Sequence, residues 1–238
     1  RQLGFSAKIV KKLEDSFLNK EYENGRVSFL RSLAKILVPG HAQDIKNSKI
    51  IYVVGFSGSG RTTLSAKMAA YFAESSRQEQ NSVTLAQYGS NKSISNDTLK
   101  SYGRLLNLKT DFINVNDDLP MVEGSSKMII DVDEKPENII ENVLSTRKLY
   151  GNNRVSVIIS LPGGSSKHMV KTIWNSSQEL KPSFALTKLD ECELSAVEFS
   201  ELAELNANIS VITGTNKILD TIAIASENVV TQYLKENC

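Results

Sequence analysis

A glycine-rich turn between a strand pattern and a helix pattern constrains this chain more than any other feature. Residues 50–54 (IIYVV) form an apolar run typical of a buried strand, and residues 64–72 (LSAKMAAYF) place apolar side chains at helical spacing. The turn between them is Gly55-Phe56-Ser57-Gly58-Ser59-Gly60-Arg61-Thr62-Thr63. In such a turn, backbone N–H groups and the positive end of the helix dipole converge on one point and stabilise an anion there. The segment is therefore predicted to be a phosphate-binding loop that holds a di- or triphosphate.

One position departs from the usual phosphate-loop pattern G-x-x-x-x-G-K-[ST], which has lysine where this chain has Arg61. Arginine keeps the positive charge but replaces a compact ammonium group with a broad planar fork. We expect phosphate binding to tolerate this change better than fast hydrolysis does. The alternative is a glycine-rich turn that binds no ligand. The predicted phosphate-binding residues are Gly55, Ser57, Gly58, Ser59, Gly60, Arg61, Thr62 and Thr63.

Composition narrows the choice of partner and compartment. The 238 residues carry a net charge of +1 with both signs mixed, so no broad basic surface is expected and DNA is not a predicted partner. No apolar run reaches the roughly 18 residues of a membrane span. Cys192 and Cys238 have no metal-binding or redox spacing and fit a reducing compartment. Since the first residue is Arg1 rather than methionine, we expect the chain to be a fragment of a longer protein.

The apolar segments outside the loop alternate between strand and helix patterns. Two helical patterns, 9–17 and 27–37, predict a small helical N domain over residues 1–46 that packs against a phosphate-loop (P-loop) domain over residues 47–238. Short apolar strands alternating with amphipathic helices indicate an α/β fold, a P-loop NTPase with a mostly parallel sheet and helices on both faces. Further strands are expected at 82–86, 112–115, 127–131, 155–160, 183–186 and 209–212, and the last helix at 220–234.

Two more strand ends carry polar groups that suit a nucleotide site. Asp131 ends the strand 127–131, where a carboxylate can reach a phosphate-bound Mg²⁺ together with the hydroxyl of Thr62. The alternative is an aspartate that ends the strand for solubility alone. Thr187-Lys188-Leu189-Asp190 follows the strand 183–186. Its aspartate can accept two hydrogen bonds from the N–H edge of guanine while the lysine stem lies along the base; the alternative is a solvated turn.

Taken together, these segments resemble the GTPases of the signal recognition particle (SRP) family. Residues 55–69 (GFSGSGRTTLSAKMA) are similar to the family pattern G-x-x-G-x-G-K-T-T-x-x-A-K-L-A, and residues 187–191 (TKLDE) match T-K-L-D-E/G. The flagellar branch, FlhF, matches best along the chain. Glu191 is its choice at that position, Leu3-Gly4-Phe5-Ser6 resembles the opening of its helical N domain, and residues 209–217 resemble its segment that contacts the base and ribose.

The resemblance implies a guanine-nucleotide site with GTP or GDP as ligand and allows Mg²⁺, held by Thr62 and Asp131, as a cofactor. It implies a homodimer, or a heterodimer with a related GTPase or a regulatory ATPase. It also implies a role in placing flagella, with flagellar base proteins as partners, in the cytoplasm at the inner face of the cell membrane near the cell pole. The implied base-binding residues are Thr187, Lys188, Asp190, Thr213, Gly214 and Asn216.

Three departures from the family pattern concern the parts that stabilise phosphoryl transfer. Besides Arg61, no aspartate occurs in residues 86–92 (AQYGSNK), where the family has D-T-x-R and where Lys92 is the nearest cation. Glu134 replaces the glycine of D-T-A-G-R and brings a carboxylate toward the phosphate charge. Phosphoryl transfer depends mostly on positioning and electrostatics, so we expect slow hydrolysis or none and assign no catalytic residue. The alternatives are a scaffold that no longer binds nucleotide and another SRP-type GTPase, such as the receptor, in protein targeting.

Overall fold

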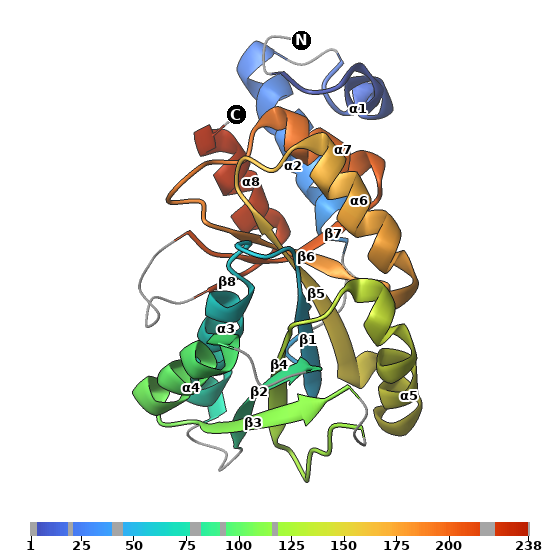
Figure 1. Ribbon diagram of the computed structural model, residues 1–238. Helices are drawn as coiled ribbons and strands as arrows, with labels where there is room; N and C mark the ends of the chain where they lie inside the picture. The colour runs from blue at the N-terminus through green and yellow to red at the C-terminus, as the bar shows by residue number, and fades with distance from the viewer. Residues whose placement is uncertain are drawn as a thin grey trace.

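One sheet runs through the middle of the molecule, and helices cover both of its faces (Figure 1). This computed structural model describes residues 4–18, 21–39, 45–76, 82–90, 94–115, 119–214 and 222–237. The eight strands lie in the order β3-β2-β4-β1-β5-β6-β7-β8, and every neighbouring pair is parallel except β7 with β8. The strands are β1 (Ile50–Val54), β2 (Val83–Gly89), β3 (Lys109–Asn114), β4 (Lys127–Val132), β5 (Val155–Pro162), β6 (Ser183–Thr187), β7 (Asn208–Ile212) and β8 (Ala223–Ile224). The predicted mostly parallel α/β sheet is confirmed.

The helices divide into two sets, one for each face of the sheet. Alternate residues of a strand point to opposite faces, and β1 illustrates this: Ile50, Tyr52 and Val54 are buried on one face, while Ile51 and Val53 are buried on the other. The first face is covered by α2 (Tyr22–Leu37), α5 (Ile140–Tyr150), α6 (Lys167–Ser177), α7 (Ala196–Glu204) and α8 (Glu227–Asn237). The second face is covered by α3 (Arg61–Ser76) and α4 (Ile94–Leu106). Short 3₁₀ turns are η1 (Glu14–Ser16), η2 (Pro136–Ile139), η3 (Asn152–Arg154) and η4 (Gln178–Leu180).

The N-terminal helices α1 (Ala7–Lys12) and α2 pack beside α7 and α8 at one end of the molecule (Figure 1). Ser6 caps α1, since its hydroxyl accepts a hydrogen bond from the backbone of Ile9. The Ser6 hydroxyl also donates to Glu204 at 2.5 Å, and its backbone N–H donates to Ser200 at 3.0 Å. Leu30 of α2 is fully buried in the same apolar core as the first face of the sheet. The helical piece thus packs on the sheet, and its boundary at residue 46 stays a prediction.

The last helix begins later than the sequence predicts. The predicted span was 220–234, but α8 is Glu227–Asn237, and residues 223–224 instead form the short strand β8. Ala223 pairs with Ile212 of β7, and the backbone N–H of Ala225 donates to the Ser210 carbonyl at 2.9 Å. Ser226 then caps α8 through a hydrogen bond from Val229. A short apolar run fits a helix or a strand equally well by pattern, and here the open edge of β7 decides in favour of a strand.

Of the helices in the described part of the chain, none combines the length and the apolar character that a membrane span requires.

Candidate functional site

The glycine loop lies where β1 leaves the sheet and α3 begins. Gly58 and Gly60 have φ angles of +78° and +84°, which side chains with a Cβ rarely adopt, so the turn depends on glycine at both positions. Ser57 and Gly58 are exposed, and among the described atoms none lies within 4 Å of a Cβ built on Gly58. The loop is therefore open to solvent at its tip.

The end of β6 is bonded directly to this loop. The Thr187 hydroxyl donates to the carbonyl oxygen of Ser59 at 2.7 Å, and the Ser160 hydroxyl at the end of β5 donates to the same oxygen at 2.8 Å. A Cβ built on Gly60 would lie 3.7 Å from the Thr187 side chain. The predicted phosphate loop and the T-K-L-D segment, 128 residues apart in sequence, are thus adjacent at the carboxyl edge of the sheet.

The predicted base-binding residues gather beside the loop from β6 and β7. Lys188 has a φ angle of +54°, and its ammonium group pairs with Glu191 at 3.3 Å. Asp190 is exposed. Gly214 packs closely on the T-K-L-D segment, since a Cβ built there would lie 2.9 Å from Leu189. Thr213, just beyond β7, bonds through its backbone N–H to Leu186 of β6 at 2.9 Å. Asn216 lies outside the described residues.

Lys67 is a part of this region that sequence reasoning did not assign to the site. It is 2% exposed on α3, and its ammonium group donates to the Thr213 hydroxyl at 3.1 Å. The signal available in the sequence was a single lysine in a helical stretch that otherwise has apolar and small residues, 64–70 (LSAKMAA). This hydrogen bond joins α3, which follows the predicted phosphate loop, to the end of β7, where the predicted base-binding residues Thr213 and Gly214 lie.

Arg61 faces the end of β4. Its Nε donates to Oδ1 of Asp131 at 2.7 Å, and its Nη2 donates to Asp133 at 2.8 Å. The Thr62 hydroxyl donates to the other oxygen of Asp131, Oδ2, at 2.6 Å. The predicted metal ligands Thr62 and Asp131 are therefore together, but in a direct hydrogen bond.

Burial sets the protonation preference of this cluster. Asp131 is fully buried, whereas the Arg61 side chain is 14% exposed. Burial raises the pKa of the Asp131 carboxyl, and the guanidinium of Arg61 together with the Thr62 hydroxyl opposes that rise.

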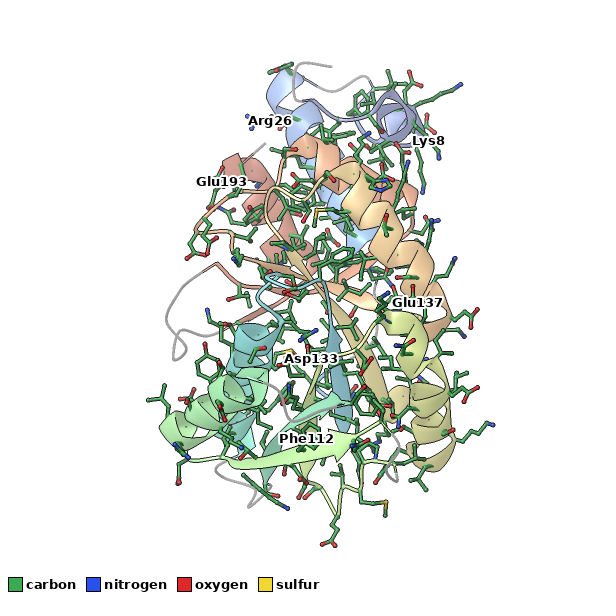
Figure 2. The ribbon with its side chains drawn as sticks, viewed as in Figure 1. Lys8, Arg26, Phe112, Asp133, Glu137 and Glu193 are labelled. Carbon is green, nitrogen blue, oxygen red and sulfur yellow. The ribbon has the colours of Figure 1, made fainter. Side chains whose placement is uncertain are left out.

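Asp133, labelled near the centre of Figure 2, is a member of this cluster that the sequence analysis did not assign to the site. The available signal was its position two residues beyond Asp131, on the same side of an extended chain.

Glu134 makes a separate contact that links two strand ends. Its carboxylate accepts hydrogen bonds from the backbone N–H and the hydroxyl of Ser90, just beyond β2, and from the Asn138 amide at 3.2 Å. These bonds, those from Ser90 foremost, lower the pKa of the Glu134 carboxyl. The charge expected beside the phosphates is thus engaged with protein donors. Lys92, the nearest cation in this segment, lies outside the described residues.

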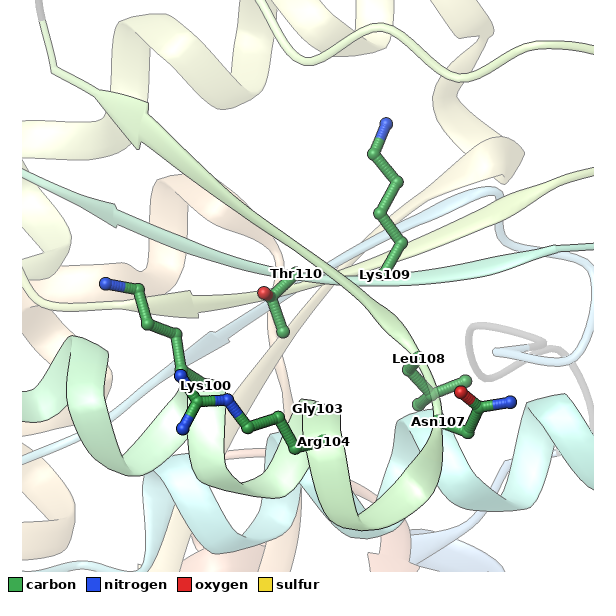
Figure 3. A pocket seen from close by; sticks show the side chains of 7 residues that line it. All are labelled: Lys100, Gly103, Arg104, Asn107, Leu108, Lys109 and Thr110. Atoms are coloured by element: carbon green, nitrogen blue, oxygen red, sulfur yellow. The ribbon is translucent and has the colours of Figure 1, made fainter.

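A hollow of about 450 Å³ lies between α4 and β3, away from this site (Figure 3). It is lined by Lys100, Gly103, Arg104, Asn107, Leu108, Lys109 and Thr110. The strand β3 is an edge strand, with β2 and β4 between it and β1. The hollow is therefore no part of the phosphate-loop site.

A known protein resembles the chain in sequence, and solved structures resemble it in fold. No protein-family model matches the chain. The signal recognition particle 54 kDa protein of Methanococcus vannielii is 26% identical over 188 residues, which is 75% of this chain and 41% of that protein. The chain thus spans about two fifths of the length of the curated relative it matches.

Solved structures resemble the chain over nearly all of its length. A crystal structure of FlhF complexed with GTP/Mg²⁺ has a TM-score of 0.70 at 17% identity, covering 98% of this chain and 94% of that one. The signal recognition particle receptor FtsY from Elizabethkingia anophelis, in complex with GDP, has a TM-score of 0.72 at 15% identity, covering 98% of this chain and 80% of that one. The predicted resemblance to the SRP-type GTPases is confirmed, and the chain has their P-loop fold.

Proposed function

We propose that this chain binds guanine nucleotides in the manner of the SRP-type GTPases and hydrolyses GTP slowly or not at all. The loop at residues 55–63 takes the phosphates, and the segment at residues 187–190 recognises the base. The ligand is GTP or GDP.

The bond from Thr187 to the Ser59 carbonyl carries this proposal. It holds the strand end that bears Asp190 against the loop that bears the phosphate-binding N–H groups. One nucleotide can therefore contact both segments at once. A second observation supports the same ligand: the Ser59 hydroxyl is buried within the loop and has no hydrogen-bond partner among the described residues.

Slow hydrolysis follows from the side chains that surround the phosphates. Arg61 is engaged with two aspartates, and Glu134 is engaged with Ser90, so neither side chain is arranged to stabilise charge on a transferring phosphoryl group. Residues 86–90 contain no carboxylate that could organise the attacking water. The T-K-L-D segment proposed to recognise the base, by contrast, matches the family pattern at residues 187–190.

The cellular setting is proposed from the resemblance to the flagellar branch. The chain acts in flagellar placement or assembly, at the cytoplasmic face of the cell membrane near the pole. Its partner is a second copy, a related GTPase or a regulatory ATPase, and flagellar base proteins receive the complex. The FtsY structures are as similar in fold as the FlhF structure, so a receptor role in protein targeting is the second candidate.

Isothermal titration with GDP, GTP and ATP tests the proposal. Both guanine nucleotides should bind, and ATP should give no heat. Asp190→Asn should weaken GDP binding by about tenfold to a hundredfold, because it replaces a charged acceptor of two hydrogen bonds. The control is Glu193→Gln, an exposed carboxylate three residues further along and labelled in Figure 2, which should leave the affinity unchanged.

The other outcomes separate the alternatives. No heat with any nucleotide would replace the proposal with a scaffold that works through its surfaces. GTP turnover as fast as that of an intact family member, abolished by Asp190→Asn, would refute slow hydrolysis. Deleting the gene distinguishes the two cellular roles, since misplaced flagella support the first and defective membrane-protein insertion supports the second.

A further inference from the structure

Both oxygens of the Asp131 carboxylate are occupied by protein donors. Oδ1 accepts from Nε of Arg61 at 2.7 Å, and Oδ2 accepts from the Thr62 hydroxyl at 2.6 Å. Asp131 is fully buried, so solvent does not reach it. The carboxylate that the sequence predicts as a metal ligand is therefore committed to two neighbours in the same chain.

The arrangement does not fit a magnesium ion at this carboxylate. Mg²⁺ requires near-octahedral oxygen ligands, usually a hydroxyl and water molecules held by a carboxylate in a P-loop site. Here the hydroxyl of Thr62 is directed at Asp131, and the space that faces Oδ1 holds a guanidinium. A divalent cation and a guanidinium facing one oxygen repel each other.

A second hydrogen bond from the Arg61 guanidinium holds this side chain beside Asp131. Nη2 donates to Asp133 at 2.8 Å, so the guanidinium spans two carboxylates two residues apart on the strand end. The Arg61 side chain is only 14% exposed. A lysine has a single point charge and cannot span both groups in this way, whereas the planar fork of arginine can.

This inference rests on the proposed nucleotide binding. We propose that Arg61 substitutes for the magnesium ion: it neutralises the carboxylates at the end of β4, and guanine nucleotide binds without Mg²⁺. The phosphates are then held by the backbone N–H groups of the loop and by the N-terminus of α3, a helix of 16 residues. The arginine at position 61, where the usual phosphate-loop pattern has lysine, is therefore the residue that makes nucleotide binding independent of Mg²⁺.

Titration of GDP in the presence of Mg²⁺ and in the presence of excess EDTA tests this proposal on the unmodified chain. The two dissociation constants should agree within about threefold. A loss of about tenfold or more in EDTA would overturn the proposal, because it would mean that Arg61 leaves Asp131 when nucleotide binds. Absence of binding in both media would refute the proposed function itself, an outcome distinct from metal dependence.

The Arg61→Lys variant tests whether Arg61 is the residue that makes GDP binding independent of Mg²⁺. The lysine releases Asp131, so GDP binding by this variant should weaken by about tenfold or more when EDTA replaces Mg²⁺. A variant as insensitive to EDTA as the parent would overturn the assignment to Arg61. Arg104→Lys on α4, exposed and remote from the loop, is the matched control and should behave as the parent does. The unmodified chain still decides the proposal if the Arg61 variant fails to fold.

Discussion

Replacing Arg61 by glutamine and Asp131 by asparagine, singly and together, measures how strongly these side chains hold each other in the nucleotide-free protein. The three variants and the parent form a double-mutant cycle, whose coupling energy isolates the interaction between the two residues. This matters because burial raises the pKa of Asp131, so the carboxylate is unfavourable there without its partner. The single substitutions mix that burial cost with the lost attraction, whereas the coupling energy does not.

The expected coupling energy follows from distance and exposure. Opposite charges about 4 Å apart attract by about 4 kcal/mol at an effective dielectric constant of about 20. The full value does not apply, since Arg61 is 14% exposed and retains Asp133, whose side chain is 36% exposed. We therefore expect about 2 kcal/mol. The exposed pair Lys100–Asp97, separated by 3.9 Å with side chains 46% and 82% exposed, is the control and should give about 0–0.5 kcal/mol.

Urea unfolding followed by tryptophan fluorescence supplies the free energies. Trp174 is the single tryptophan, and its ring stacks on Phe184 of β6 at 6.0 Å, so its emission reports the integrity of the sheet. Each unfolding curve gives a free energy by linear extrapolation. A coupling energy no larger than that of the Lys100–Asp97 pair would refute the view that Arg61 is committed to the end of β4.

Three further predictions concern other parts of the molecule. Gly60→Ala should cost about 1 kcal/mol of stability in urea unfolding, because the φ of +84° at this position strains a residue with a Cβ. The same variant should bind GDP more weakly in titration. Tyr52→Phe removes a hydroxyl bonded to Thr146 at 2.9 Å and should cost about 1–2 kcal/mol while leaving GDP affinity unchanged, since it lies on the α5 side of the sheet. Glu134→Gln should be less stable than the parent at neutral pH by under about 1 kcal/mol, measured by urea unfolding across pH. The hydrogen bonds from Ser90 lower the pKa of Glu134, so its contribution is present above the ordinary glutamate pKa and is lost as the pH falls through the lowered value.

The fold and the two segments of the candidate site could be predicted because their signals are local. A glycine turn after an apolar strand predicts a phosphate loop from a dozen residues, and T-K-L-D predicts a base-binding segment from four. Parallel strands then bring both segments to one edge of the sheet without any knowledge of side-chain packing. This reasoning required the two segments to be in contact, and the hydrogen bond from Thr187 to the Ser59 carbonyl provides that contact. The sequence did not show which atoms would form it.

The remaining parts depend on neighbours that lie far apart in the sequence. Arg61 was predicted at the phosphates, and only the register of β4 beside β1 reveals that Asp131 and Asp133 are within reach of its fork. Glu134 likewise finds Ser90 across two strand ends. The strand β8 was missed because an alternating apolar run of four residues has no preference until an open sheet edge is beside it.

The hydrogen bond from Thr187 to the Ser59 carbonyl also bears on how this chain changes over evolutionary time. Thr187 is needed for architecture, so selection on folding alone would preserve it in a lineage that had abandoned its ligand. Asp190 is different: it is exposed, and its side chain forms no hydrogen bond or ion pair within the part of the chain that the structure describes. In such a lineage the threonine would persist while the aspartate drifted. A comparison of these two positions, three residues apart, among related sequences would therefore indicate whether the proposed ligand is under selection.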